Sequence, residues 1–452
     1  MGFFVSLLYH YYMFWTGIDR SIQVMIITIF GLVVFHAPLS VWLGSVIPEY
    51  TLLIKAWKEL LMLCIALLLL LSLSYHRILK KVFGDRLIQL ICGYILLHLI
   101  TLAFFEGNQQ QIIAGLMIDL RYIAFFGLVY IASRFLFLPR RYVLWTFVGA
   151  SGISLLFAVL QITILPRDVL QYLGYSKDTI QPYLTVDRNE NFVRINGTMR
   201  GPNPLGAMMM MWTICAGVFA AMHRTFTHKK WWLFLLLYLM LGLTLWSSYS
   251  RSAVLGLCVS VVTAVVVWHG IRLPRSFYLI FASLAVISVI SFMTLRDSHF
   301  FQTVIFHTDP GEGNMVDSDE GHANSLRDGM QRALAQPLGA GIGSTGSASY
   351  FSDQPVVIEN QYLLIAHEVG WLGIVLFLII FGLVLYRLAL QSKKDWLAMA
   401  MVSSGVGLAV IGMILPVFAD DTVSIIWWGL AGLALGSYYQ RKRHDKKTKT
   451  TP

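Results

Sequence analysis

The stretch LLIKAWKELLMLCIALLLLLSLSY, residues 52–75, and the connection HRILKKVFGDR after it, residues 76–86, decide the fold class of this chain. The first part is long and apolar enough to cross a bilayer as one helix, since about 20 apolar residues span the hydrocarbon core. The second part is short and rich in Lys and Arg, as cytoplasmic connections of membrane proteins are. The same alternation recurs along the chain and predicts a polytopic membrane protein.

The composition of the whole chain agrees with this prediction. Of the 452 residues, 57% are hydrophobic and 13% are charged, whereas soluble globular proteins are about 25% charged. The apolar runs are continuous rather than alternating, which favours helices over a β-barrel. The formal net charge of +10 comes mainly from the C-terminal tail and from residues that flank apolar runs, so we expect no nucleic-acid partner.

The predicted fold is all-α, with about twelve transmembrane helices. We place them at residues 21–45, 52–75, 86–105, 112–137, 142–165, 203–222, 231–248, 252–269, 276–295, 360–388, 396–417 and 421–439. Residues 1–20 have no basic region and no cleavage site typical of a signal peptide, and we expect an aromatic segment at the membrane interface. Five parts follow: that N-terminal segment 1–20, nine spans within 21–295, a long loop at 296–359, three spans within 360–439, and a basic tail at 440–452.

The charge of the short connections predicts the orientation. The basic connections are assigned to the cytoplasm by the positive-inside rule, and the turns VIPEY, EGNQQ and FADD, which contain no Lys or Arg, to the outside. Twelve spans then leave both termini in the cytoplasm. Two long connections, 166–202 and 296–359, fall outside, and connections of such length are often functional.

Arginines on the predicted external side need a reason, because charge bias disfavours them there. The first long connection ends RINGTMRGPNPLG, residues 194–206, which contains Arg194 and Arg200. We expect Asn203 to be the N-cap of the sixth span and Pro204 to be its first residue.

The eighth span begins in the same manner. It opens with YSRSAVLG, residues 249–256, in which Ser250 is the expected cap and Arg251 lies in the first turn. A cation is unfavourable at that end of a helix dipole, so something negative should compensate. Helix N-termini with arginines favour a phosphate-bearing ligand; the alternative is that these arginines pair with the acidic second loop or with lipid phosphates.

One arginine is expected inside the membrane. Arg121 lies about ten residues, or roughly 15 Å, into the fourth span. A charge at that depth should face a cavity or a partner. Asp119 is too close in sequence to share its helix face, and both a functional and a structural role for Arg121 stay open.

The second long loop holds the candidate proton acceptors. Residues 322–336 are predicted to be helical, with Leu326, Met330, Ala333 and Leu334 on one face, and Pro337 ends the helix. His322 and Glu359 are the two candidates; a solvated histidine, and a Glu that simply begins the tenth span, are the structural alternatives.

Two other patterns in this loop are discounted. Residues 341–346 read GIGSTG and match GxGxxG, but no strand precedes them, so no nucleotide site is predicted. The acidic residues lack the spacing of a known calcium loop, and we expect no metal. They are Asp309, Glu312, Asp317, Asp319 and Glu320.

Taken together, these motifs resemble the family of O-antigen ligases and O-antigen polymerases. The resemblance is carried by RINGTMRGPNPLG before the sixth span, by Tyr-Ser-Arg-Ser at the eighth, and by a long external loop. In that loop PLGAGIG from Pro337, ENQYL from Glu359 and EVGWLG from Glu368 follow in the family's order. Topology covers nearly the whole chain, and specific matching is confined to about 194–206, 246–256 and 325–373.

The resemblance implies a glycosyltransferase of the cytoplasmic (inner) membrane whose active site faces outward. Such enzymes transfer a glycan from undecaprenyl pyrophosphate to lipid A core, to another lipid-linked repeat or to protein, without a metal or other cofactor and with inversion. The implied partners are this donor, a glycan or lipid acceptor, the bilayer and other glycan-assembly proteins. The family's pyrophosphate-binding arginines correspond to Arg194, Arg200 and Arg251.

One departure from the family affects the base. Similar ligases have His-Asn where this chain has Glu359 and Asn360, and that histidine is proposed to activate the acceptor hydroxyl. Glu359, or His322 earlier in the loop, would then be the base. This leaves a polymerase, or a ligase for another acceptor, open. A transporter of lipid-linked glycans and a non-catalytic scaffold are the alternatives from other functional classes. Intramembrane charges and internal repeats are typical of transporters, and neither feature is prominent in this sequence.

Overall fold

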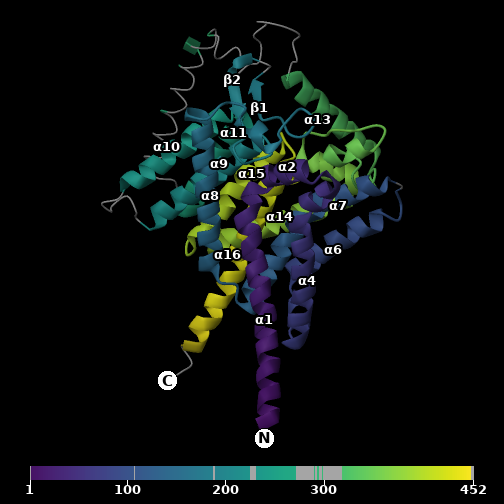
Figure 1. Cartoon of the computed structure of the whole chain (residues 1–452), viewed down its shortest axis with the longest axis vertical. Helices are drawn as coiled ribbons and strands as arrows, with labels where there is room; N and C mark the ends of the chain where they lie inside the picture. Colours follow the sequence, from purple (N-terminus) through teal and green to yellow (C-terminus); the bar gives the residue numbers. More distant parts are fainter. Residues whose placement is uncertain are drawn as a thin grey trace.

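The computed structural model describes residues 2–105, 107–186, 189–223, 231–270 and 318–448, with isolated positions between 283 and 298. Of residues 2–14, 318–320 and 441–448 it describes the backbone alone. The chain is helical almost throughout this part, and the predicted all-α class is confirmed (Figure 1).

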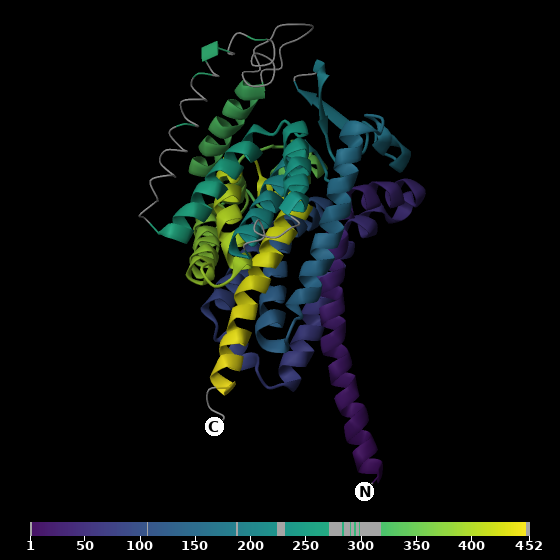
Figure 2. The same ribbon diagram turned by 90° about the vertical axis from the view of Figure 1, so that its left-hand side faces the viewer.

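The first half of the chain contains eight α-helices. They are α1 Gly2–Leu32, α2 His36–Val46, α3 Thr51–Lys55, α4 Trp57–Tyr75, α5 Leu79–Phe83, α6 Arg86–Thr101, α7 Gln109–Ile131 and α8 Arg140–Thr163. Short 3-10 turns lie at Val33–Phe35 (η1), Pro48–Tyr50 (η2) and Val169–Leu173 (η4), and a π-helical turn at Ala132–Leu136 (η3) ends α7. Figure 2 shows the chain turning aside where α1 gives way to α2.

The second half begins with a two-stranded hairpin and continues in helices. The strands are β1 Tyr183–Val186 and β2 Asn189–Ile195; the helices are α9 Pro202–Met222, α10 Trp231–Ser247, α11 Arg251–His269, α13 Ser318–Ala335, α14 Gln361–Gln391, α15 Trp396–Gly412 and α16 Asp421–Thr448. Two 3-10 turns, η7 Gly346–Phe351 and η8 Val417–Ala419, precede α14 and α16. The predicted helix at 322–336 is confirmed and begins earlier, at Ser318.

Seven helices of the described part are long and apolar enough to cross a membrane, and three shorter apolar helices accompany them. The chain is therefore a multi-pass membrane protein. The twelve-span count itself stays a prediction, because the ninth span, 276–295, falls almost wholly outside the described residues. Both termini lie at one end of the molecule, and the hairpin and α13 at the other (Figure 1).

The last helix forms the centre of the bundle. Every residue of α16 from Thr422 to Ser437 is buried. A Cβ at Gly432 would lie 2.8 Å from the Phe126 carbonyl of α7, and one at Gly436 would lie 2.4 Å from the Ser133 side chain. Small residues let membrane helices approach closely, so these glycines bring α7 and α16 into backbone contact.

Candidate functional site

A buried turn fixes the two arginines of the RINGTMRGPNPLG motif. Between β2 and α9, Asn196 donates to the Gln181 carbonyl at 2.7 Å, and the Gly197 amide donates to the Gln161 side chain at 3.0 Å. Thr198 lies 2.5 Å, oxygen to oxygen, from Ser154 of α8. The motif is therefore anchored to α8 between Arg194 and Arg200, which leaves each arginine at one edge of a rigid turn.

Arg194 joins three elements. On β2, it donates from Nε to the Ser248 carbonyl before α11, at 3.0 Å, and from its terminal nitrogen to Asn203 Oδ1 on α9, at 2.7 Å. The predicted capping role of Asn203 is wrong. Helix α9 begins at Pro202 with Gly201 as N-cap, so Asn203 lies inside the first turn and its side chain orients Arg194 instead.

The start of α11 lies against α9 at this junction. Ser250 is the N-cap of α11 and Arg251 is its first residue, as the sequence predicts, although the Ser250 side chain makes no capping hydrogen bond. A Cβ at Gly206 would lie 2.8 Å from the side chains of both Ser250 and Ala253. Glycine at 206 thus allows the close approach that sets Arg251 near the Arg194 contacts.

Arg200 faces the turn before α16. It is exposed, and it acts electrostatically on Asp420, the residue before α16. Burial raises the pKa of Asp420 above its usual value, while the Val423 amide hydrogen bond and the charges of Arg121 and Arg200 hold that pKa down against neighbouring Asp421. The 413–421 turn therefore brings an acidic group within range of two arginines.

Arg121 interacts with two residues of that same turn. It is 7% exposed, pairs with Asp421 and donates to the Ala419 carbonyl. Lys58 Nζ and His36 Nε2 also reach Asp421, at 3.2 and 2.7 Å. Because α7, α4, α2 and α16 all contribute, this ion cluster ties together helices that are far apart in sequence.

The two candidate bases contact each other. His322 on α13 contacts Glu359 through Nδ1 and Oε2, and both side chains are about one-third exposed, at 34% and 36%. The Glu359 amide donates to Ser325 Oγ at 2.9 Å, which holds α13 against the start of α14. The alternatives that the sequence left open are therefore members of one acid–imidazole pair.

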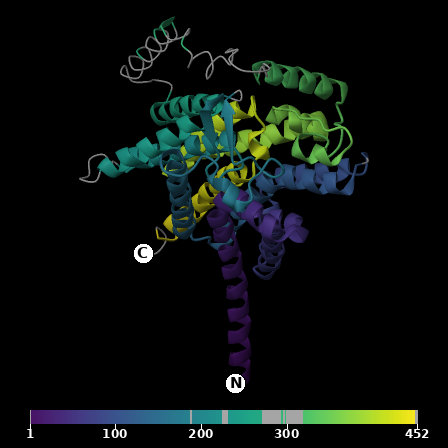
Figure 3. The same ribbon diagram turned by 45° about the horizontal axis from the view of Figure 1, so that its top comes forward.

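The pair and the arginines are linked by the 413–421 turn. Asn360, the N-cap of α14, donates to the Met413 carbonyl at 2.8 Å, and Gln361 accepts from the Phe418 amide at 2.8 Å. One end of this turn thus contacts the residues that follow Glu359, and the other end faces Arg121 and Arg200. Figure 3 shows α13 and the hairpin at the same end of the molecule.

The glycine-rich segment has a structural role. Gly339, Gly341, Gly343 and Gly346 all have positive φ. The Ala340 amide donates to the His367 carbonyl at 2.6 Å, and a Cβ at Gly343 would lie 2.4 Å from the Gln111 carbonyl. Only glycine fits such approaches, so this segment inserts between α7 and α14.

A buried carboxyl pair lies beneath that segment, and sequence reasoning missed it. Glu368, 2% exposed, accepts from the Thr345 amide at 3.2 Å and interacts electrostatically with the buried Asp119. The only available sequence signal was a charged residue inside each of two apolar runs.

Two sets of predicted residues remain without a described geometry. Asp309, Glu312 and Asp317 lie outside the described residues, and the side chains of Asp319 and Glu320 are not described. Within the described chain, no group of three or more His, Cys, Asp or Glu side chains is arranged to hold a metal ion.

Comparison with known families supports the resemblance drawn from the motifs. The family model described as O-antigen ligase matches residues 235–378. The match supports the O-antigen ligase/polymerase family. It runs from α10 to the middle of α14 and so includes Arg251, His322 and Glu359. No curated protein matches the chain.

Proposed function

We propose that this protein is a membrane glycosyltransferase of the O-antigen ligase/polymerase type. It transfers a glycan from an undecaprenyl-pyrophosphate-linked donor to an acceptor hydroxyl at the external face of the cytoplasmic membrane. One observation supports the proposal: Arg194 on β2 donates a hydrogen bond to Ser248, three residues before Arg251 at the start of α11, and an acid–imidazole pair lies at the same end of the molecule.

The arginines bind the leaving group in this mechanism. Arg194, Arg200 and Arg251 surround the diphosphate, with support from the N-terminus of α9, where a phosphate is favoured. As the bond between the anomeric carbon and the diphosphate oxygen breaks, negative charge grows on the diphosphate. Fixed donors stabilise that charge, and a single one is often worth about 3 kcal/mol in the transition state.

The acid–imidazole pair receives the proton. A neutral His322 donates its Nδ1 proton to Glu359, which leaves Nε2 without a proton and able to accept the acceptor's hydroxyl proton. The hydroxyl oxygen then bonds to the anomeric carbon from the face opposite the diphosphate, with inversion. Undecaprenyl pyrophosphate leaves, and the proton stays on the imidazole until it returns to solvent. A positioned base of this kind contributes about 100- to 10,000-fold in rate.

An in vitro transfer assay tests the arginines. Purified protein, lipid-linked donor and acceptor are combined, and release of undecaprenyl pyrophosphate is measured for Arg194→Gln and Arg251→Gln. We expect each to lose about 100-fold or more in rate. The matched control is Arg167→Gln, because Arg167 is also exposed at this end and donates to the Glu190 carbonyl, at 3.3 Å. Equal rates for all three variants would remove the arginines from the mechanism.

The acceptor decides between a polymerase and a ligase. If lipid-linked repeat units serve as both donor and acceptor, the product lengthens and the protein is a polymerase. If another lipid or a protein is consumed, it is a ligase. The departure at Glu359 and Asn360 from the His-Asn of similar ligases favours an acceptor other than lipid A core.

A further inference from the structure

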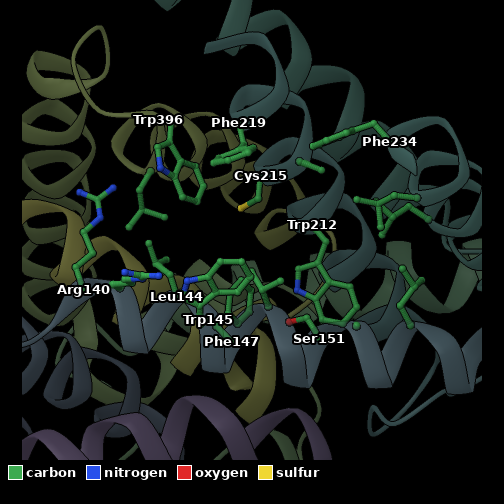
Figure 4. Close-up of a pocket in the computed structure, with 18 residues that line it drawn as sticks. Arg140, Leu144, Trp145, Phe147, Ser151, Trp212, Cys215, Phe219, Phe234 and Trp396 are labelled. Atoms are coloured by element: carbon green, nitrogen blue, oxygen red, sulfur yellow. The ribbon is translucent and has the colours of Figure 1, made fainter. Parts of the chain in front are cut away.

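A large apolar cavity lies away from the proposed site. It has a volume of about 740 Å³ and is lined from α8, α9, α10 and the start of α15, a size within the range of ligand pockets. Figure 4 shows aromatic side chains on its walls, among them Trp145, Phe219 and Trp396, with Arg140 at one end. The cavity is therefore an apolar chamber with a charged mouth.

The mouth lies at the end of the molecule that holds the termini. Helix α8 begins there with Arg140 and Arg141 and runs toward the hairpin (Figure 2). Arg140 is neutralised by Asp395, to which it donates two hydrogen bonds of 2.5 Å. In the part of the chain that the structure describes, no acidic side chain pairs with the exposed Arg141, so this guanidinium remains to attract an anion.

The helix end strengthens that attraction. The first turn of α8 contains no acidic residue, and its N-cap, Pro139, makes no side-chain hydrogen bond. Two cations at a helix N-terminus are unfavourable for the dipole, and an anion there is favourable. A phosphate at the mouth would satisfy both Arg141 and the helix end.

Two polar side chains lie at the inner end of the cavity. The side chains of Ser151 and Trp212 both line the wall there (Figure 4). They are 8% and 6% exposed, and neither the Ser151 hydroxyl nor the Trp212 indole nitrogen has a hydrogen-bond partner among the described residues. Buried polar atoms without partners are costly, and both of these side chains belong to the cavity wall.

The depth of the cavity matches one leaflet. On α8 the lining extends from Arg141 to Leu155, fourteen residues or roughly 21 Å along a helix, which is about half of a bilayer of about 40–45 Å with its headgroups. Acyl chains whose headgroup lies at the mouth end at this depth, whereas a polyprenyl carrier chain is longer than one leaflet. We propose that this cavity binds an anionic phospholipid of the leaflet next to the termini, with its phosphate at Arg141.

Native mass spectrometry of the full-length protein in detergent tests the proposal with three probes: phosphatidylglycerol and phosphatidylethanolamine that carry identical chains, and a polyprenyl phosphate. Phosphatidylglycerol should be retained preferentially, and Arg141→Gln should lower its apparent affinity about tenfold, as loss of one charge-assisted hydrogen bond does. The control is Arg86→Gln, an exposed arginine in the first turn of α6.

A second pair of variants tests the chamber. A side chain at Gly152, which lines the cavity, would meet nothing within 4 Å, and neither would one at Gly149 on the same helix outside the lining. Gly152→Leu should fill the cavity and reduce retention of both phospholipids, while Gly149→Leu should not. Equal retention of the two phospholipids by the natural protein, equal effects within either variant pair, or preferred retention of a polyprenyl phosphate would overturn the proposal. None of these outcomes bears on glycan transfer.

Discussion

At the scale of single residues, the proposed site is built by uncharged groups that orient charged ones. The Ser248 carbonyl and the Asn203 side chain direct Arg194 without neutralising it. Gly206 affects Arg251 indirectly, because the absence of a side chain at position 206 leaves room for the start of α11. The orientation of each guanidinium therefore depends on residues that never touch a substrate.

Gly206→Val should impair transfer more than folding. The new side chain would collide with Ser250 and Ala253 and displace the first turn of α11, with a stability loss of about 1–3 kcal/mol. We expect a transfer rate at least tenfold lower at a temperature where the protein remains folded. Gly242→Val on α10, where a Cβ meets nothing within 4 Å, is the control; equal losses in both would contradict the account.

Asp420 caps the start of α16 and also carries a titratable carboxyl group. Two substitutions distinguish the effects of these two features on stability. Its Oδ1 accepts from the Thr422 and Val423 amides at 3.0 and 2.9 Å. Asp420→Asn keeps this cap, whereas Asp420→Ala loses about 1 kcal/mol. Thermal unfolding in detergent should therefore rank Ala below Asn at every pH.

The raised pKa of Asp420 sets the pH dependence of that comparison. A carboxyl whose pKa is higher folded than unfolded supports stability fully below its unfolded pKa and loses that contribution as pH rises through the folded pKa. Asp420→Asn removes this group, so natural protein should lose stability relative to the Asn variant as pH rises across that interval. A difference that does not change with pH would refute this sign.

At the scale of elements, the broken helix α14 organises the active end. Gly370 has φ of +73°, and a Cβ there would lie 2.5 Å from the Pro337 carbonyl. At this break, the backbone amides of the glycine-rich segment donate hydrogen bonds to the carbonyls of His367 and Glu368. Residues 337–346 are thereby fixed against α14, and α13 with them.

Gly370→Ala should destabilise this arrangement by about 1–3 kcal/mol, in addition to the collision with Pro337. The matched variant is Gly382→Ala on the same helix, where a Cβ meets nothing within 4 Å. That change should be neutral or stabilising by up to about 1 kcal/mol, since Ala is the better helix former. Thermal unfolding of both variants is the measurement, and similar midpoints would exclude a special role for the break.

The sequence predicted those helices that are determined by residues close together in the chain. The start of α11 at Ser250 and Arg251 follows from a cap pattern, and the helix after residue 318 follows from periodicity. The start of α9 was misplaced because Pro202 and Pro204 are both suited to a first turn. Cap and proline preferences do not decide between them; the buried turn at 196–198 does.

Contacts between distant residues were beyond sequence reasoning. Arg121 and Asp421 are 300 positions apart, and Asp119 and Glu368 lie in different apolar runs, so no spacing rule connects them. His322 and Glu359 were both chosen as candidate bases, but their pairing depends on how α13 packs on α14. Leu326, Met330 and Leu334, expected to share a helix face, are exposed, while Ala333 beside them is buried.

At the scale of the whole molecule, the two ends differ in chemistry. The proposed glycan site lies at the end with the hairpin, and the proposed phospholipid cavity opens at the end with the termini (Figure 1). In the orientation predicted from loop charge, the hairpin faces outward and the termini lie in the cytoplasm.

Single-cysteine labelling tests that orientation. In a variant without the native cysteines, Asn191→Cys in β2 should react with a membrane-impermeant thiol reagent added to intact cells, because its side chain is exposed at the hairpin end. A cysteine in the C-terminal tail should react only after lysis. Reaction of the tail cysteine in intact cells would invert the topology and move the proposed site to the wrong side.

The central claim is that the arginines bind the diphosphate while the His322 imidazole accepts the proton. Single-turnover transfer with measured donor binding tests this claim most directly. His322→Ala should bind the lipid-linked donor as the natural protein does yet transfer about 100-fold more slowly or worse. Arg251→Gln should instead lose donor affinity along with transfer. If His322→Ala transfers at the natural rate from a saturated donor complex, the imidazole is not the base and the account is contradicted.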